Sequence, residues 1–160
     1  MRTAASLIAA VLFSSTAAAV QCDVQTLTFP PVAYSAADLS GSVVTQNLTI
    51  RCAVDAAGPP VNGVVSVNVG LSSGLWGNAS SRAMRGPNSA LLLYNLYLPT
   101  QPNTVWGNAS NNSATANITG LTSTNPTAST DVFVTMRMPP AQWGAPAGAY
   151  SDQLTVTLTF

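Results

Sequence analysis

The chain contains no lysine, no glutamate and no histidine among its 160 residues. Its charged side chains are five arginines and five aspartates, which give a formal net charge of zero at pH 7. Histidine and glutamate are the usual proton-transfer groups and lysine is the usual Schiff-base amine, so most catalytic schemes lack a participant. Binding to nucleic acid needs clustered lysines and arginines that neutralise phosphates. We therefore expect no nucleic acid partner.

A pair of carboxylates is the catalytic arrangement that remains, as in aspartic proteases and glycosidases. None of the aspartates lies in a D-T-G or D-S-G turn, and their spacing matches no metal-ligand pattern. We expect no enzymatic activity, no cofactor and no metal site. The alternative is an exported hydrolase that uses Asp131 or Asp152. The aspartates available for a pair are Asp23, Asp38, Asp55, Asp131 and Asp152.

The sequence also lacks an apolar run long enough to cross about 30 Å of hydrocarbon as a helix. Its N-terminus, MRTAASLIAAVLFSSTAAAVQC, has a basic start at Arg2, an apolar run from Ala4 to Phe13, and an A-x-A cleavage signal at Ala17 to Ala19. This pattern is typical of a secretory signal peptide. We predict a signal peptide over residues 1–19, a mature domain over residues 20–160 and no membrane insertion after cleavage. A membrane anchor is the alternative.

Cysteine is scarce, and the two that occur are Cys22 and Cys52. An even number of cysteines in an exported protein predicts a disulfide. The alternative, two free or metal-binding thiols, has no third ligand to complete a site. If the two cysteines lie on successive strands, the bridge links neighbouring strands.

Apolar and polar residues alternate with a period of two in several segments, which predicts half-buried strands. Glycine and proline separate these segments, and no segment after the signal peptide has a helical period. Short strands joined by turns predict an all-β fold, an antiparallel sandwich or barrel. The predicted strands lie within residues 22–29, 42–54, 63–71, 90–98, 130–138 and 150–160, with a weaker candidate at 114–121.

The final segment, YSDQLTVTLTF, has the clearest alternation in the chain. Threonines occupy one face, at positions 155, 157 and 159, and apolar side chains occupy the other. We predict that the apolar face lines the core. Its residues are Leu154, Val156, Leu158 and Phe160.

The stretch WGNAS occurs twice, at Trp76 to Ser80 and at Trp106 to Ser110. The flanking residues share nothing further, so we do not expect a duplicated domain. Exposed tryptophan rings beside glycine and asparagine can stack on sugars, whereas in the structural alternative each ring folds over the end of the sandwich. The arginines after the first copy either hold an anion or a sugar carboxylate, or are solvated surface. The candidate surface site consists of Trp76, Asn78, Arg82 and Arg85.

Three runs carry a resemblance to a known family. They are LLLYNLYLPTQPNTVWG at residues 91–107, PAGAYSDQLTVTLTF at residues 146–160, and the opening CDVQTLTF with its second cysteine at position 52. Together they resemble the spore coat protein U domain family, which includes the pilins of the archaic chaperone–usher pathway of Gram-negative bacteria. Trp106 and Gly107 belong to the first run, and we expect them to form a structural turn.

The resemblance implies an incomplete immunoglobulin-like sandwich that lacks its final strand. A periplasmic chaperone lends a strand to the groove, an outer-membrane usher replaces it with a strand from a neighbouring subunit, and a fibre grows at the cell surface. Such strand addition gains affinity from backbone hydrogen bonds and from pockets for alternate side chains. The resemblance therefore implies a secreted pilus subunit that serves attachment and biofilm formation, with the groove beside residues 154–160.

Pilins of this family that polymerise carry their donor strand before the first cysteine. If cleavage follows Ala19, only Val20 and Gln21 precede Cys22. We expect such a subunit to receive a strand but not to give one, which suits a minor or tip-located position. The alternative is a stand-alone secreted coat or carbohydrate-binding protein of the same fold.

Overall fold

The computed structural model describes residues 20–25, 29, 34–54, 63–98, 100–108, 112–122 and 124–160. The predicted signal peptide, residues 1–19, and Asp55 lie outside them. Within the described residues the chain forms strands and one 3₁₀ turn at Pro87–Ser89, which agrees with the predicted all-β class.

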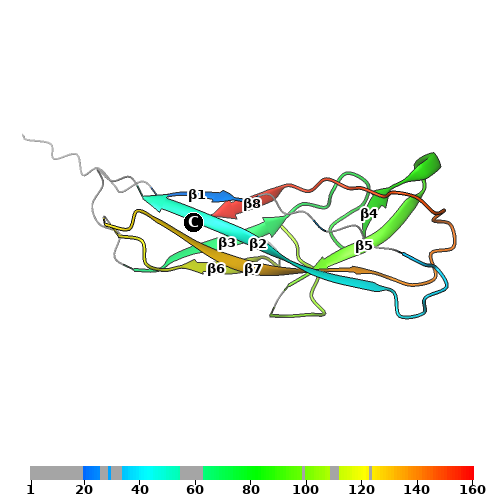
Figure 1. The fold of residues 1–160 in the computed structure, drawn as a ribbon, viewed down its shortest axis with the longest axis horizontal. Helices are drawn as coiled ribbons and strands as arrows, with labels where there is room; N and C mark the ends of the chain where they lie inside the picture. The colour runs from blue at the N-terminus through cyan, green and yellow to red at the C-terminus, as the bar shows by residue number, and fades with distance from the viewer. Residues whose placement is uncertain are drawn as a thin grey trace, which may run out of the picture.

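Two antiparallel sheets pack into a sandwich (Figure 1). The sheets are built around β2 and β7 on one side and β3 on the other, and β2 and β7 run side by side along much of the molecule. The five-stranded sheet has the order β1 (Val20–Val24), β2 (Ser42–Val54), β7 (Thr127–Met138), β5 (Leu91–Tyr97) and β4 (Arg82–Arg85). The three-stranded sheet has the order β6 (Ala114–Ile118), β3 (Val65–Leu71) and β8 (Val156–Thr159).

The core consists of the side chains that the period of two places on the inner faces, because successive residues of a strand point to opposite faces. The inner face of β2 is buried from Leu48 onward, that of β7 is buried from Val132 onward, and that of β5 is buried along its length. The buried residues in these three predicted segments are Leu48, Ile50, Cys52, Val54, Leu92, Tyr94, Leu96, Leu98, Val132, Val134, Met136 and Met138.

Every segment that was predicted as a strand contains one, including the weaker candidate, now β6. The last segment differs in its extent, because its strand covers only Val156–Thr159. Before β8, the backbone of Ser151 exchanges two hydrogen bonds with Arg85 of β4, at 2.9 and 3.0 Å. The Ser72 N–H then donates to the Thr155 carbonyl at 3.0 Å, ahead of the pairing of β8 with β3. This C-terminal segment thus crosses from one sheet to the other.

Strand β4 was not predicted from the sequence, where its two arginines were considered only as a ligand site or as solvated surface. Arg82–Arg85 pairs antiparallel with β5, and Arg82 lies opposite Tyr94. The inward side chain at the start of this strand is charged, so the alternation of polarity that marks the other strands is missing here. A rule based on apolar alternation cannot find such a strand.

The disulfide between Cys22 and Cys52 is confirmed. The two residues lie directly opposite each other in the register of β1 and β2, so the bridge ties the edge strand to its neighbour. It closes a loop with a sequence separation of 30 residues.

We expect the Cys22→Ala, Cys52→Ala double variant to lose about 3 to 4 kcal/mol of unfolding free energy. Without the bridge the unfolded chain gains conformational entropy, which favours the unfolded state. Urea denaturation followed by circular dichroism, beside wild type with and without reductant, measures the loss. A change below about 1 kcal/mol would show that the bridge does not hold the fold together.

Candidate functional site

One flank of the sandwich is open. β1 and β8 are the terminal strands of their sheets, and they lie side by side on this flank (Figure 1, blue and red). Among the described residues, β1 pairs only with β2, and β8 only with β3. The outer edge of a terminal strand presents N–H and C=O groups that can pair with another chain. We call this flank, with β1 and the segment from Leu154 to Thr159, the open flank.

The side chains that line the open flank are apolar and only half-buried. Val20, Cys22 and Val24 of β1 pack against the core but remain partly exposed. The same holds for the predicted residues of the last segment, which are Leu154, Val156 and Leu158. By contrast, the inward valines of the neighbouring strand β3, at positions 67 and 69, are fully buried. The open flank is therefore the side on which the core is least covered.

Phe160 does not belong to this lining. Its side chain is 60% exposed, and β8 ends one residue earlier, at Thr159 opposite Asn68 of β3. The prediction that Phe160 lines the core was wrong, because alternation continues in the sequence beyond the point where the strand ends. The opposite flank is different, since β6 lies against β7 there and closes the sandwich.

Arg82 is fully buried and binds backbone carbonyls at the end of β3 and at Trp106. Its Nε donates to the Ser72 carbonyl at 2.9 Å, and its Nη2 donates to the carbonyls of Trp106 at 2.7 Å and Leu71 at 3.3 Å. Burial lowers the pKa of Arg82, but guanidinium remains protonated in proteins. The predicted surface role for Arg82 was wrong, because 0% of the residue is exposed.

Trp106, in the second WGNAS copy, is buried beside this arginine. Its indole Nε1 donates to the Val69 carbonyl at 2.8 Å, and its backbone N–H donates to the Leu96 carbonyl at 2.8 Å. Trp106 thus contacts β3 through its ring and β5 through its backbone. Its burial agrees with the structural role that was expected, but the turn itself lies earlier in the chain, at residues 102–103.

Asp152 is the shared acceptor of a second hydrogen-bond network, which lies where the C-terminal segment leaves β4. Its carboxylate accepts hydrogen bonds from the Tyr94 hydroxyl at 2.7 Å and from the backbone N–H of Leu75 at 2.8 Å. Burial and the hydrogen bond to Asp152 raise the pKa of Tyr94 above its usual range, so the hydroxyl remains a donor. Asp152 therefore ties the loop before β4 to the segment that leads into β8.

Trp76 and Arg85 are brought together by the fold. The guanidinium carbon of Arg85 lies 4.6 Å from the centroid of the Trp76 ring, a cation–π contact. Asn78 has a local role instead, since its Oδ1 accepts from the N–H groups of Ser80 and Ser81 at 3.0 and 2.9 Å. Of the four residues of the predicted surface site, the structure thus joins Trp76 and Arg85.

Sequence reasoning missed the residues that share a cavity with this pair. Among them are Ser89, Ser151, Asp152 and Gln153. No local pattern in the sequence relates these residues to Trp76. Ser89 follows β4 in the chain, whereas Ser151, Asp152 and Gln153 come near only because the C-terminal segment passes beside β4.

The structure does not bring together a carboxylate pair from Asp131 and Asp152. Asp131 lies on the outer face of β7, where it accepts hydrogen bonds from Thr49 at 2.6 Å and Asn47 at 3.2 Å. Asp152 belongs to the Tyr94 network instead. Within the described residues, no three His, Cys, Asp or Glu side chains are grouped so that they can hold a metal ion. The described part of the chain also has no helix long and apolar enough to cross a membrane.

The family model of the Spore Coat Protein U domain, SCPU, matches residues 8–157. The chain belongs to this family, as the three sequence runs predicted. A search of curated proteins finds no significant match.

Solved structures of pilus subunits have a similar fold. One is the CsuC–CsuE chaperone–tip adhesion subunit pre-assembly complex from the archaic chaperone–usher Csu pili of Acinetobacter baumannii, with 22% identity and a TM-score of 0.56. That match covers 88% of this chain, which spans 40% of the length of the matched chain. Another is the P pilus rod subunit PapA, with 17% identity, a TM-score of 0.49, and coverage of 86% of this chain and 97% of that chain. The TM-score of 0.56 to the Csu complex, together with the two antiparallel sheets, confirms the predicted immunoglobulin-like β-sandwich.

We expect Arg82→Leu to lower the unfolding free energy by about 3 kcal/mol or more, because several buried carbonyls lose their hydrogen-bond donor. The matched control is Arg51→Leu, since Arg51 is an exposed arginine on β2 and should change the free energy by less than about 1 kcal/mol. Urea denaturation of both variants beside wild type measures the difference. Equal effects of the two substitutions would contradict a structural role for Arg82.

Proposed function

We propose that this chain is a structural subunit of a chaperone–usher surface pilus, assembled by donor-strand complementation. The observation that carries the proposal is the open flank, where two terminal strands with half-buried apolar side chains lie side by side. Membership of the SCPU family and the likeness of the fold to a Csu pilus complex support it. The partners are then a periplasmic chaperone, an outer-membrane usher and neighbouring subunits.

A strand inserted at the open flank would contact both sheets, because β1 ends one sheet there and β8 ends the other. Its backbone would pair with the outer edge of β8, while its alternate side chains would cover Leu154, Val156 and Leu158. Covering a valine or leucine that was exposed contributes about 1.5 to 3 kcal/mol when burial is complete. Several half-buried side chains together can therefore supply a substantial affinity. The disulfide keeps β1 in place as the other wall.

The subunit's position and role in the fibre also form part of our proposal. We place the subunit at a minor or tip position, on the basis of the predicted cleavage after Ala19, and assign it to attachment and biofilm formation. The protein is exported through the periplasm, and no catalytic step belongs to this role. The absence of histidine, glutamate and lysine from the sequence supports a structural subunit over an enzyme.

The test uses two aspartate substitutions on adjacent residues of β8. Leu158 points into the open flank and Thr157 points to solvent, so the two variants add the same charge on opposite faces. We expect Leu158→Asp to reduce capture of the chain by its cognate chaperone about tenfold or more, because the charge would be buried under the inserted strand. Thr157→Asp should be captured like wild type. The measurement is co-purification after periplasmic co-expression.

Circular dichroism and formation of the Cys22–Cys52 bridge check that both variants fold. A wild-type chain that is a soluble, cooperatively folded monomer and is bound by no chaperone would contradict the proposal. Equal capture of the two variants would show that the strand is added elsewhere.

A further inference from the structure

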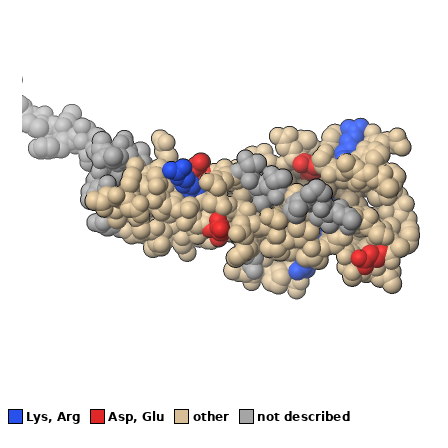
Figure 2. All heavy atoms as spheres, viewed as in Figure 1, with Lys and Arg blue, Asp and Glu red and all other residues tan. Residues whose placement is uncertain are grey.

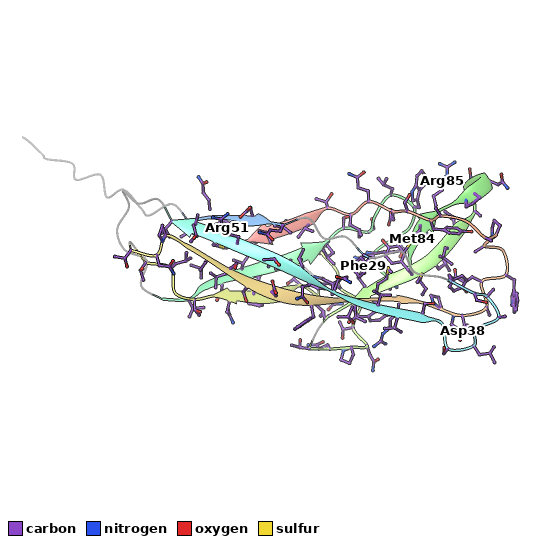
Figure 3. All side chains as sticks on the ribbon, viewed as in Figure 1. Phe29, Asp38, Arg51, Met84 and Arg85 are labelled. Carbon is purple, nitrogen blue, oxygen red and sulfur yellow. A yellow bond between two sulfur atoms is a disulfide. The ribbon has the colours of Figure 1, made fainter. Side chains whose placement is uncertain are left out.

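A cavity of about 540 Å³ lies outside the open flank, between the loop before β4, the end of β4 and the segment that leads toward β8. Arg85 lines this cavity, and Arg51 lies on β2 opposite β1. Figure 3 shows the two arginines toward opposite ends of the molecule. Its lining includes Trp76, Arg85, Ser89, Ser151, Asp152 and Gln153.

The walls of this cavity are held in place by hydrogen bonds. Arg85 and Ser151 are paired through their backbones, and the Arg85 Nη2 donates to the Ser89 hydroxyl at 2.6 Å. Asp152 is held by donors on Tyr94 and Leu75. Gly86 also lines the cavity, and a Cβ there would collide with the Tyr150 ring, so the two residues pack closely. A ligand would therefore meet a preorganised site, which reduces the entropy cost of binding.

The lining combines an aromatic surface with hydrogen-bond donors and hydrogen-bond acceptors. Trp76 is 40% exposed despite the guanidinium of Arg85 over its ring, so part of the indole remains accessible. Arg85 supplies N–H donors, Asp152 supplies acceptors, and the side-chain amide of Gln153 can supply either. A sugar presents C–H groups that pack on an aromatic ring, and hydroxyls that both donate and accept.

The charge of the lining argues for a neutral ligand. One arginine and one aspartate line the cavity, so their formal charges cancel. A phosphate or carboxylate would meet the carboxylate of Asp152, and a cation would meet Arg85. Charged side chains are also few and scattered on the face shown in Figure 2, so the surface there does not steer a charged ligand.

We propose that this cavity is a binding site for a neutral saccharide, with Trp76 as the stacking surface and Arg85, Asp152 and Gln153 as hydrogen-bonding groups. The site does not use β1 or the paired part of β8. Saccharide binding is therefore expected whether or not the open flank receives a strand, and its test is independent of pilus assembly.

The experiment titrates the full exported chain with the methyl glycosides of glucose, galactose, mannose and N-acetylglucosamine, followed by NMR. Sialyllactose and inorganic phosphate are added as separate charged probes. We expect at least one neutral glycoside to bind, and Trp76→Ala to weaken this binding about tenfold or more through loss of the ring contact. Gln153→Ala, at an exposed side chain, should weaken it several-fold without affecting folding.

Trp143→Ala is the matched control, because Trp143 is 72% exposed and is not part of the cavity lining. It should bind the glycoside like wild type, and near-ultraviolet circular dichroism checks the folding of every variant. The proposal is overturned if no neutral glycoside binds, if only sialyllactose or phosphate binds, or if Trp143→Ala loses as much affinity as Trp76→Ala.

Discussion

Backbone N–H and C=O groups need hydrogen-bond partners, and at the open flank the outer edges of β1 and β8 have none among the described strands. This constraint explains several features together. The apolar side chains of both strands are half-buried because no described strand covers them. The disulfide ties the edge strand β1 to β2, so one wall of the flank is fixed covalently. An added strand would satisfy the backbone and complete the core in the same step.

The other half of the molecule is held together by polar groups. Arg82 binds carbonyls at the end of β3 and at Trp106, while Asp152 binds Tyr94 and the loop at Leu75. Hydrogen bonds to charged groups are stronger than neutral ones, and buried carbonyls are costly to leave without a donor. This half therefore has a rigid surface, and the proposed saccharide site lies on it, apart from the open flank.

Much of the fold follows from local patterns in the sequence. The period of two placed β2, β5 and β7 and their inner faces correctly, and the two cysteines predicted the bridge between β1 and β2. The pattern failed at β4, because the buried Arg82 has the polarity of a surface residue. It also failed at Phe160, because the alternation in the sequence continues one residue beyond the end of β8. The partners of Trp76 in the cavity could not be predicted, since tertiary structure alone brings Asp152 and Gln153 beside β4.

Hydrogen–deuterium exchange on the chain, alone and bound to its cognate chaperone, tests the central claim that the open flank receives a strand. We predict that the amides of β8 (Val156–Thr159) that face the open flank, and not those that face β3, become strongly protected in the complex, with a smaller gain at β1. The amides between β3 and β6, which are already paired, should not change. A stable complex that leaves the exchange of β8 unchanged would contradict the account.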